Sequence, residues 1–358
     1  MDFHKIENIT VEDVLNAHMA DLAVQDKYGV KYHQFWVNQK AGTVFCLTEG
    51  PNAQTCEMVH QIAHGNVACA MTEVETGYFK LFMGEGHHVD HGVVRKKDGT
   101  VDLGYRSILI ASARGIATAK DSRDLQLPHW AKTIAAKKIT EFNGREVKWD
   151  GVDCLIGVFN ETTDAVKCAC QIQHSLLDSS HDDKVIFKIG LSADQPVTKD
   201  GEFFTKAIQL AHRLCNTAED NQILTSSLIK SLCEETVLPA DANIKYLDMS
   251  EEQFVSTLLD IAHKNLSNQS FSIAGMCKDI GVSRPQLYRK VTSLTGRAPN
   301  DFLRDLRLEK ALGLLKQKTG NVAQVALEVG YNNPSYFAKC FFDKFGCTPS
   351  EISIARHP

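Results

Sequence analysis

Histidine side chains gather in the first part of the chain at spacings that suit a metal ion. His60 and His64 lie four residues apart in VHQIAHG, so on a helix their side chains share one face. Two imidazoles in that arrangement can chelate a borderline metal such as Ni(II), Zn(II) or Cu(II). Eight of the 14 histidines fall within the first 91 residues: His4, His18, His33, His60, His64, His87, His88 and His91. This enrichment predicts a metal site in the N-terminal segment.

A different chemistry is predicted near the C-terminus, on a helix that follows Ser283. The pair Ser283 and Gln286 has the pattern of a capping box, and Gly281 supplies the turn before it. Together with a helix near 273–277, this forms a helix-turn-helix, whose second helix enters the major groove of DNA. Arg and Gln side chains can bond guanine and adenine edges bidentately. The residues opposite the apolar stripe of the second helix, or at its margins, are Arg284, Pro285, Gln286, Tyr288 and Arg289.

The same pattern recurs further along the chain. A helix begins at Val322, Gly330 makes the turn, and a second helix over 334–342 turns Phe337 and Phe341 inward. Between the two copies, DFLRDLRLEKALGLLKQ predicts a long amphipathic helix that holds them at a fixed separation. The residues of the second copy that are predicted to face DNA are Asn333, Pro334, Ser335 and Lys339.

The distribution of charge agrees with a nucleic-acid reader attached to a separate body. Residues 260–358 contain 14 Lys and Arg against 8 Asp and Glu, a net charge of +6. The whole chain carries −5, which leaves −11 for the rest. Hydrophobic residues make up 43% of the chain, which excludes disorder as its main state. Eleven cysteines without a CxxC pair, no secretory signal and no long apolar stretch predict reduced thiols in a cytoplasmic protein without a membrane span.

Two connectors, residues 84–104 and 237–252, divide the chain into three predicted domains over 1–83, 105–236 and 253–358. The first has the order β-α-β-β-α-β, with its helices over 10–28 and 52–64, which is the ferredoxin-like arrangement. The middle segment alternates strands and helices as an α/β sandwich, and the last segment is helical throughout.

The helix-turn-helix tandem resembles the DNA-binding domain of AraC-type regulators. The resemblance lies in SRPQLYRKVTSLTG, RLEKALGLL and VALEVGYNNPSYFAKCFFDKFGCTPSEI. It implies two recognition helices in successive turns of the major groove. Carried over by position, the residues facing bases or backbone would be Pro285, Tyr288, Arg289, Pro334, Ser335 and Lys339. The two prolines depart from the family pattern, in which a polar or aromatic base reader is common at these positions.

The N-terminal segment resembles a family of small bacterial ferredoxin-like domains described as nickel-binding. The resemblance covers residues 1–77 and includes MDFHKIENITVEDVLNAHMADLAVQDKYGV and FWVNQKAGTVFCLTEGPNAQTCEMVHQIAHG. With His60 and His64 as the central pair, His4, His18 and Cys46 are candidates to complete the metal site. The rival hypotheses are a small-molecule pocket around Tyr32 and Trp36, and a dimer interface formed by the sheet.

The middle segment resembles a class III nucleotide cyclase domain, through GREVKWDGVDCLIGVFNETTDAVKCACQIQHSL and the segment that follows it. Active members use two aspartates to hold two metal ions, and an Asn and an Arg four residues apart to orient ribose and stabilise charge. Ser112 stands at the first aspartate position, which removes a metal ligand. The other positions fall on Lys148 for the base, Asp153 or Asp150 for the second aspartate, Gln209 for the Asn and Arg213 for the Arg. We therefore expect no catalysis; a dimerising scaffold and a noncatalytic nucleotide-binding domain are the two hypotheses.

Together these features predict an α+β multidomain protein with a ferredoxin-like domain, a cyclase-like α/β sandwich and an all-α tandem helix-turn-helix domain. We expect a transcriptional regulator rather than an enzyme, whose N-terminal domains sense a metal or small molecule or form a homodimer. Double-stranded DNA is the expected partner, RNA polymerase is a further candidate, and DNA affinity should fall steeply with salt. Two alternatives stay open: a nucleotide cyclase fused to a DNA-binding domain, and a nickel-binding protein in which the metal does not control DNA binding.

Overall fold

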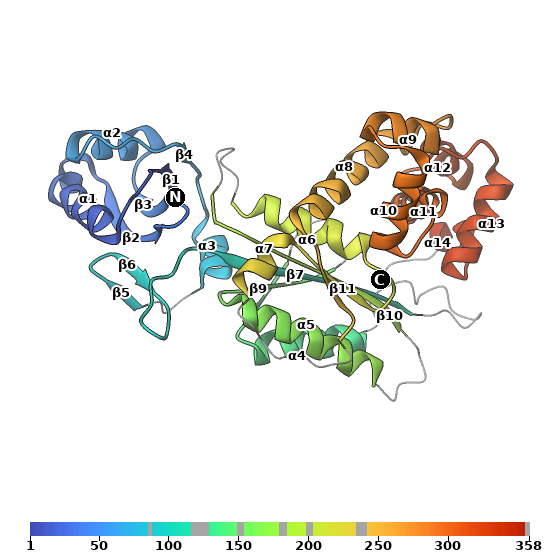
Figure 1. The fold of residues 1–358 in the computed structure, drawn as a ribbon, viewed down its shortest axis with the longest axis horizontal. Helices are drawn as coiled ribbons and strands as arrows, with labels where there is room; N and C mark the ends of the chain where they lie inside the picture. The colour runs from blue at the N-terminus through green and yellow to red at the C-terminus, as the bar shows by residue number, and fades with distance from the viewer. Residues whose placement is uncertain are drawn as a thin grey trace.

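The computed structural model describes seven stretches of the chain, namely residues 1–84, 88–115, 129–148, 154–178, 185–197, 203–233 and 242–354. Figure 1 shows two β-sheets and a helical C-terminal module in chain order. Among the described residues, no helix has both the length and the apolar character that crossing a bilayer requires.

The N-terminal sheet has the strand order β4-β1-β3-β2-β6-β5, and helices α1 and α2 pack against each other. The predicted first helix begins after Thr10, which forms a capping box with Asp13, and the second begins after the cap Asn52. The bounds are β1 (Asp2–Lys5), α1 (Val11–Val24), β2 (Lys31–Asn38), β3 (Thr43–Glu49), α2 (Ala53–Ala63), β4 (Ala70–Met71) and α3 (Thr76–Met83), with a 3-10 turn, η1 (Gln25–Tyr28), after α1. Along the chain, β1 to β4 and the helices α1 and α2 follow the predicted order β-α-β-β-α-β. Helix α3 was not expected from the sequence.

The first connector is more than a linker, which corrects the prediction for residues 84–104. Its described part forms the hairpin β5 (His88–Asp90) and β6 (Val93–Arg95); β6 pairs with β2, and β5 becomes the edge strand of the sheet. Val93 and Val94 are buried. The connector looked polar because these two valines are flanked by Gly, His and charged residues, which hid a short strand.

The middle domain is a second six-stranded sheet with the order β12-β11-β10-β7-β9-β8. Helices α4 and α5 cover one face and α6 covers the other (Figure 1), and each face has its own apolar core. The bounds are β7 (Arg106–Gly115), α4 (His129–Glu141), β8 (Arg145–Val147), β9 (Leu155–Phe159), α5 (Thr162–Leu177), β10 (Val185–Asp194), α6 (Thr205–Thr217), β11 (Gln222–Thr225), α7 (Ser227–Leu232) and β12 (Ile244–Tyr246). The second predicted connector, residues 237–252, also contains regular structure. It includes β12, which pairs with β11 of the middle sheet.

The C-terminal module contains the two predicted helix-turn-helix units. Ser283 forms the predicted capping box with Gln286, and the turn residues Gly281 and Gly330 both adopt positive φ. The first helix, α8, begins at Met249 inside the predicted connector and packs its apolar face against α6 of the middle domain. The bounds are α8 (Met249–Asn265), α9 (Ile273–Ile280), α10 (Arg284–Thr295), α11 (Pro299–Lys316), α12 (Val322–Glu328), α13 (Pro334–Phe345) and α14 (Pro349–Ile354).

The two sheets share an apolar core. Phe3, Trp36 and Phe45 project from the N-terminal sheet into a cluster that also contains Phe82 of α3 and Ile108 of β7. This face of the N-terminal sheet is therefore covered by the chain's own middle domain. A dimer formed through this face would have to displace the middle domain from these apolar side chains.

Two arginines fasten this inter-domain joint at the end of α3. Arg145 donates to the carbonyl oxygens of Leu81 and Phe82, and Arg106 donates to that of Met83. These are carbonyls of the last helical turn, which lack partners within the helix. Arg106 is fully buried and also forms a bidentate ion pair with Asp102. The joint is thus held by directional hydrogen bonds as well as by apolar contact.

Candidate functional site

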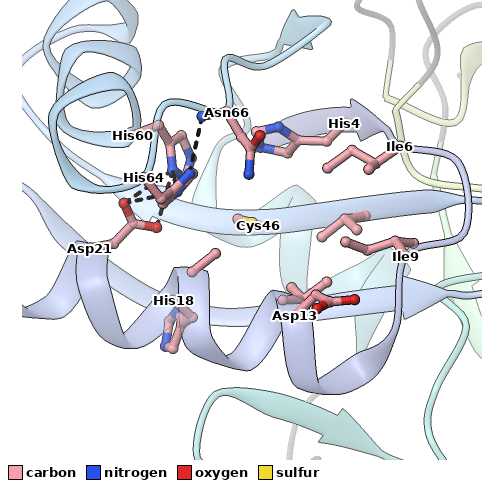
Figure 2. Close-up of a pocket in the computed structure, with 13 residues that line it drawn as sticks. His4, Ile6, Ile9, Asp13, His18, Asp21, Cys46, His60, His64 and Asn66 are labelled. Atoms are coloured by element: carbon pink, nitrogen blue, oxygen red, sulfur yellow. Dashed lines mark hydrogen bonds and ion pairs between the residues drawn. The ribbon is translucent and has the colours of Figure 1, made fainter.

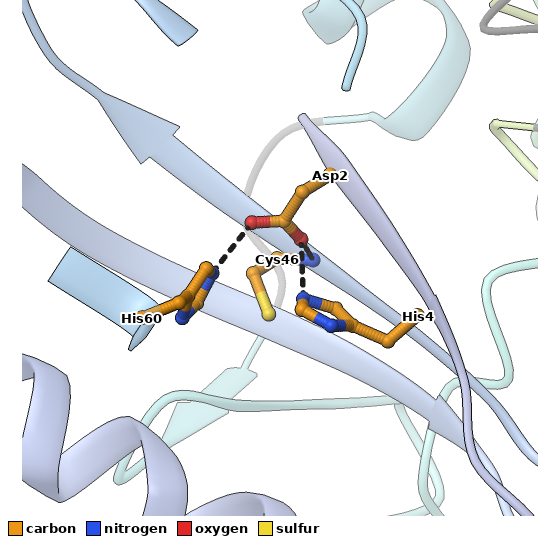
Figure 3. A group of neighbouring side chains, drawn as sticks. All are labelled: Asp2, His4, Cys46 and His60. Carbon is orange, nitrogen blue, oxygen red and sulfur yellow. Dashed lines mark hydrogen bonds and ion pairs between the residues drawn. The ribbon is translucent and has the colours of Figure 1, made fainter. Parts of the chain in front are cut away.

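Four potential metal ligands meet between the N-terminal sheet and α2. Asp2 and His4 come from β1, Cys46 from β3 and His60 from α2 (Figure 3). Each is buried, and their ligating atoms lie within 4.8 Å of one another. Asp2 and His4 share a face because alternate residues of a strand point the same way, and Cys46 lies opposite Asp2 in the β1–β3 pair.

His60 connects this group to a second one, formed with Asp21 of α1 and His64. Its Nε2 lies 2.9 Å from an Asp2 carboxylate oxygen, and its Nδ1 lies 3.1 Å from an oxygen of Asp21. Ionised carboxylates only accept hydrogen bonds, so both ring nitrogens of His60 must carry protons to satisfy them. Burial opposes this charge, but the hydrogen bonds that His60 donates to Asp2 and Asp21 outweigh it and raise the pKa of His60 to about 9. Without metal, His60 is therefore an imidazolium held between two carboxylates.

His64 contributes to the second group from the end of α2. Its Nε2 lies 3.3 Å from Asp21 and 3.1 Å from Nδ1 of His60. The two members of the predicted i,i+4 pair therefore lie side by side and share Asp21 as a partner (Figure 2). A cavity of about 70 Å³ adjoins both groups, and its lining combines these donor side chains with apolar residues such as Ile6 and Val14.

The chemistry of these side chains fits a borderline divalent metal. Imidazole nitrogen, carboxylate oxygen and thiol sulfur are all within reach, and such mixed sets suit nickel, zinc or copper better than calcium or magnesium. Nδ1 of His4 is buried and has no hydrogen-bond partner among the described residues. Burial of a polar atom without a partner is costly, and a metal ligand bond would satisfy it. Burial and the charge of Asp2 raise the pKa of Cys46 well above its usual value, so a metal must displace the thiol proton to use that sulfur.

The structure brings His4, Cys46, His60 and His64 close together and places one predicted ligand elsewhere. His18 belongs to neither group; its ring packs beside Phe35 and against the backbone of Gly92 in the β5–β6 hairpin. The sequence reasoning also missed Asp2 and Asp21 as members of the site. Asp2 stands two residues before His4 on a strand, a spacing that puts both side chains on one face. Asp21 is brought to His60 and His64 by the packing of α1 against α2, which no local spacing indicates.

Within the described part of the chain, Tyr32 and Trp36 belong to different clusters. Trp36 is fully buried in the core shared with the middle domain, whereas Tyr32 belongs to a separate cluster and donates its hydroxyl hydrogen to the Cys56 carbonyl oxygen. The two side chains that were grouped on sequence proximity therefore serve two different cores.

The predicted DNA-facing residues lie at the exposed beginnings of α10 and α13. All nine are exposed: Arg284, Pro285, Gln286, Tyr288, Arg289, Asn333, Pro334, Ser335 and Lys339. Arg289 stands six residues after the cap Ser283, and Lys339 stands six residues after the cap Asn333, so the two cations occupy equivalent positions of the repeated unit.

Two of the nine have an additional structural role. The Gln286 side-chain oxygen accepts hydrogen bonds from the backbone and hydroxyl of Ser283. The Asn333 side-chain oxygen accepts from the backbone nitrogens of Ser335 and Tyr336. These oxygens cap their helices, so the bidentate contact with adenine that an amide can make is not open to them in this arrangement.

Each described residue predicted for a nucleotide has its own surroundings. Lys148 and Gln209 are exposed, and Arg213 forms an ion pair with Asp260 of α8 at 2.6 Å. Ser112 contacts Sγ of Cys215. Asp150 and Asp153 lie outside the described residues. Arg213 thus fastens the middle domain to the C-terminal module in this structure.

Comparison with known proteins gives two family matches. Residues 276–353 match a family described as "Helix-turn-helix domain", and residues 1–74 match "Nickel responsive protein SCO4226-like". The first match, together with the regulators below, supports an AraC-type helix-turn-helix domain at the C-terminus. The second supports a nickel-responsive type of domain at the N-terminus.

Similar proteins cover only parts of the chain. Histidine kinase P4 of Formosa agariphila is 31% identical over 44% of this chain and 11% of its own length. The uncharacterised HTH-type transcriptional regulator YidL of Escherichia coli is 30% identical over 46% of this chain and 55% of its own length. The crystal structure of SCO4226 from Streptomyces coelicolor is 40% identical over 19% of this chain and 83% of that one, with a TM-score of 0.18. The chain thus spans about half or less of these two curated relatives.

Proposed function

We propose that this chain is a transcriptional regulator in which a borderline divalent metal, nickel in the first place, controls DNA binding. The observation that carries the proposal is the position of the metal-type donors on strands that also form the inter-domain core. The matches to a nickel-responsive family and to a helix-turn-helix family support the two ends of this account. The strand order β4-β1-β3-β2 with two helices supports the ferredoxin-like interpretation of the first domain.

The residues that would hold the metal are His60, His4 and Asp2, with Cys46 as a further ligand. Asp21 and His64 would then orient His60 from behind, in the way that carboxylates commonly orient metal-binding histidines. A bound divalent cation supplies positive charge where His60 otherwise carries a proton. The two aspartates are suited to either state, because burial opposes their ionisation but hydrogen bonds to histidine keep the pKa of each below its usual value.

The metal site and the core shared with the middle domain lie on opposite faces of the same two strands, β1 and β3. In β1, Asp2 and His4 face the site and Phe3 faces the core shared with the middle domain. In β3, Cys46 faces the site and Phe45 faces that core, where its ring stacks on Phe3 at 5.4 Å. Any shift of these strands on metal binding moves the side chains that contact the middle domain. We propose that the shift reaches the DNA-binding helices through α6 of the middle domain and α8 of the C-terminal module, which pack against each other.

A ligand controls an equilibrium only if it binds one arrangement better than another. In this account, metal favours the arrangement of α10 and α13 that matches two successive major-groove turns. The middle domain acts as a noncatalytic scaffold, because Ser112 replaces the aspartate that a cyclase would use. A cyclase fused to a DNA-binding domain remains the alternative enzyme hypothesis, and cyclic product formed from ATP or GTP with Mn(II) would support it.

The proposed activities are tested separately by metal binding and by DNA binding. Equilibrium dialysis should find one Ni(II) ion per chain, because both donor groups share His60, and the double variant His60→Ala/His64→Ala should lose it. Fluorescence anisotropy on DNA from upstream of the gene should find binding that weakens steeply with salt, as counterion release requires. A flat salt response would contradict the DNA-binding assignment, and retention of nickel by the double variant would contradict the site.

A further inference from the structure

A large cleft separates the middle sheet from the C-terminal module. Its volume is about 940 Å³, which lies within the range of pockets that enclose small organic ligands. One wall is formed by the middle domain, including Ser112 of β7 and Lys188 of β10, which are direct neighbours in the sheet. The opposite wall is formed by α11 and the end of α13, including Lys344. The cleft therefore lies between the middle domain and the C-terminal module that carries the predicted DNA-facing helices.

Cationic side chains from three elements converge on this cleft. Lys188 comes from β10, Arg297 from the turn between α10 and α11, and Lys344 from α13. All three are largely withdrawn from water, with side-chain exposures of 18%, 21% and 12%. Burial, reinforced by the positive charge of Arg297, lowers the pKa of Lys188 to about 8. A buried ammonium group beside two further cations favours an incoming negative charge.

The carboxylates of the cleft are unequal partners for these cations. Asp305 accepts from Arg297 and lies 3.5 Å from Lys344, and is itself mostly buried. Asp220 lies 3.7 Å from Lys188 but is 52% exposed, and Glu309 lies 3.1 Å from Lys344 but is 54% exposed. Ion pairs with such exposed partners contribute little. The oxyanion of a ligand can take the place of the Asp220 and Glu309 carboxylates, whose side chains can then rotate into the solvent. A further carboxylate, Glu219, lines the cleft beside Gly296.

Apolar side chains complete the lining. Ile186 lies on the sheet side, while Leu306, Leu312 and Phe345 lie on the side of the C-terminal module. A cleft with both buried cations and apolar walls suits a molecule that has an anionic group and an apolar or aromatic body. This lining includes Ser112 and Cys154 but, among the described residues, not Lys148, Gln209 or Arg213. The cleft thus shares the Ser112 position with the site that the cyclase resemblance implies, and it adds the cations of the C-terminal module.

We propose that this cleft binds an organic phosphate of nucleotide size, with its oxyanion between Lys188, Arg297 and Lys344. Because Lys188 belongs to the middle sheet and Lys344 to the second recognition helix, the ligand would tie the sensor body to the DNA-reading surface. Occupancy would thereby fix the position of α13 relative to the middle domain. The site and the metal site lie in different domains, and the cleft can be tested in the absence of metal.

Isothermal titration calorimetry on the full chain tests this proposal, with ATP in the presence of EDTA as the probe. Adenosine serves as the uncharged control and tripolyphosphate as the anion without an apolar body. We expect ATP to bind, adenosine not to bind, and tripolyphosphate to bind more weakly than ATP. The variant Lys188→Met should weaken ATP binding about tenfold or more, since it removes a charge-assisted contact. Lys137→Met, on the exposed side of α4, removes the same charge elsewhere and should leave ATP binding unchanged.

The DNA-reading surface is also cationic and must be separated from the cleft. The double variant Arg289→Ala/Lys339→Ala should bind ATP like the original chain. Loss of ATP binding in this double variant with retention in Lys188→Met would overturn the proposal, as would an absence of binding to both anions. Equal affinity for ATP and tripolyphosphate would overturn the role given to the apolar wall. If circular dichroism shows that Lys188→Met does not fold, Lys344→Gln provides the same test from the opposite wall.

Discussion

Asp2 and Phe3 follow one another in β1, and their side chains lie on opposite faces of the N-terminal sheet. Asp2 meets His60 in the candidate metal site, and Phe3 stacks on Phe45 in the core shared with the middle domain. The alternation of a β-strand therefore places metal chemistry and inter-domain packing on either side of a single backbone.

This arrangement predicts that a substitution on the core side of β1 can weaken the effect of nickel on DNA binding without weakening nickel binding itself. Phe3→Leu keeps an apolar side chain in the core and should cost about 1 kcal/mol of stability. Equilibrium dialysis should show nickel binding unchanged, and anisotropy should show DNA binding that responds less to nickel. The matched control is Phe337→Leu, a core change of the same kind in the C-terminal module. An undiminished response to nickel in Phe3→Leu would exclude the strand as the route.

The state of His60 predicts that metal binding releases protons. Below its folded-state pKa of about 9, His60 is protonated between Asp2 and Asp21, and a metal must displace that proton. For one proton released, the apparent affinity for Ni(II) should rise about tenfold per pH unit between about pH 6 and pH 8. Titration calorimetry in two buffers of different ionisation enthalpy measures the protons directly. Equal heats in both buffers would show that no proton leaves.

The same group predicts how the metal-free protein responds to alkali. The pKa of His60 is raised from 6.5 to about 9 on folding, so its contribution to stability is complete below pH 6.5 and is lost as the pH rises through 9. Urea unfolding without metal should therefore show falling stability across this window. His60→Gln should be less stable than the original chain at neutral pH and should show a flatter profile there. A profile for the original chain as flat as that of His60→Gln would contradict the imidazolium assignment.

Arg289 and Lys339 occupy equivalent positions on α10 and α13 and predict equivalent effects on DNA binding. If each contacts a phosphate, Arg289→Ala and Lys339→Ala should each reduce the salt slope by about 1; if either reads a base, its loss should cost about 1–3 kcal/mol and relax specificity. Anisotropy titrations over a salt series distinguish these outcomes. Lys137→Ala on α4 removes a charge far from this surface and should change neither quantity. An effect of Lys137→Ala equal to the other two would point to general electrostatics.

The hydrogen bonds of Arg106 predict that its replacement lowers the stability of the joint between the N-terminal and middle domains. Its guanidinium is fully buried and bonded to Asp102 and to the Met83 carbonyl oxygen. Arg106→Met removes the cation that faces the buried Asp102 carboxylate and should cost about 3–5 kcal/mol. Arg106→Lys keeps the charge but not the fork and should cost less. Chemical unfolding measures both, and a neutral result for Arg106→Met would show that the ion pair does not hold the joint.

The sequence predicts the regular parts of the fold well and the joints poorly. The capping patterns at Thr10 and Ser283 locate helix starts because a cap is a local interaction between neighbouring residues. By contrast, α3 and the β5–β6 hairpin depend on partners far away in the chain, such as Arg145 and Phe35. Local patterns contain no trace of those contacts.

The candidate site was predictable in part for the same reason. The pair His60 and His64 is visible as a helical spacing, and the structure places ring nitrogens of the two 3.1 Å apart. Asp2 and Asp21 join it only because β1 and α1 fold back onto α2, so their role is set by tertiary structure. His18 was included by residue type, yet its helix turns it toward Gly92 instead.

The most direct test of the account is the ratio of DNA affinities with and without Ni(II), measured by fluorescence anisotropy at one salt concentration. For the original chain we predict that nickel changes the affinity about fivefold or more, within the usual range of coupling between two sites. The double variant His60→Ala/His64→Ala should bind DNA with the affinity of the metal-free protein and show no response to nickel. Equal DNA affinity of the original chain in both conditions, with nickel shown to be bound, would contradict metal control of DNA binding.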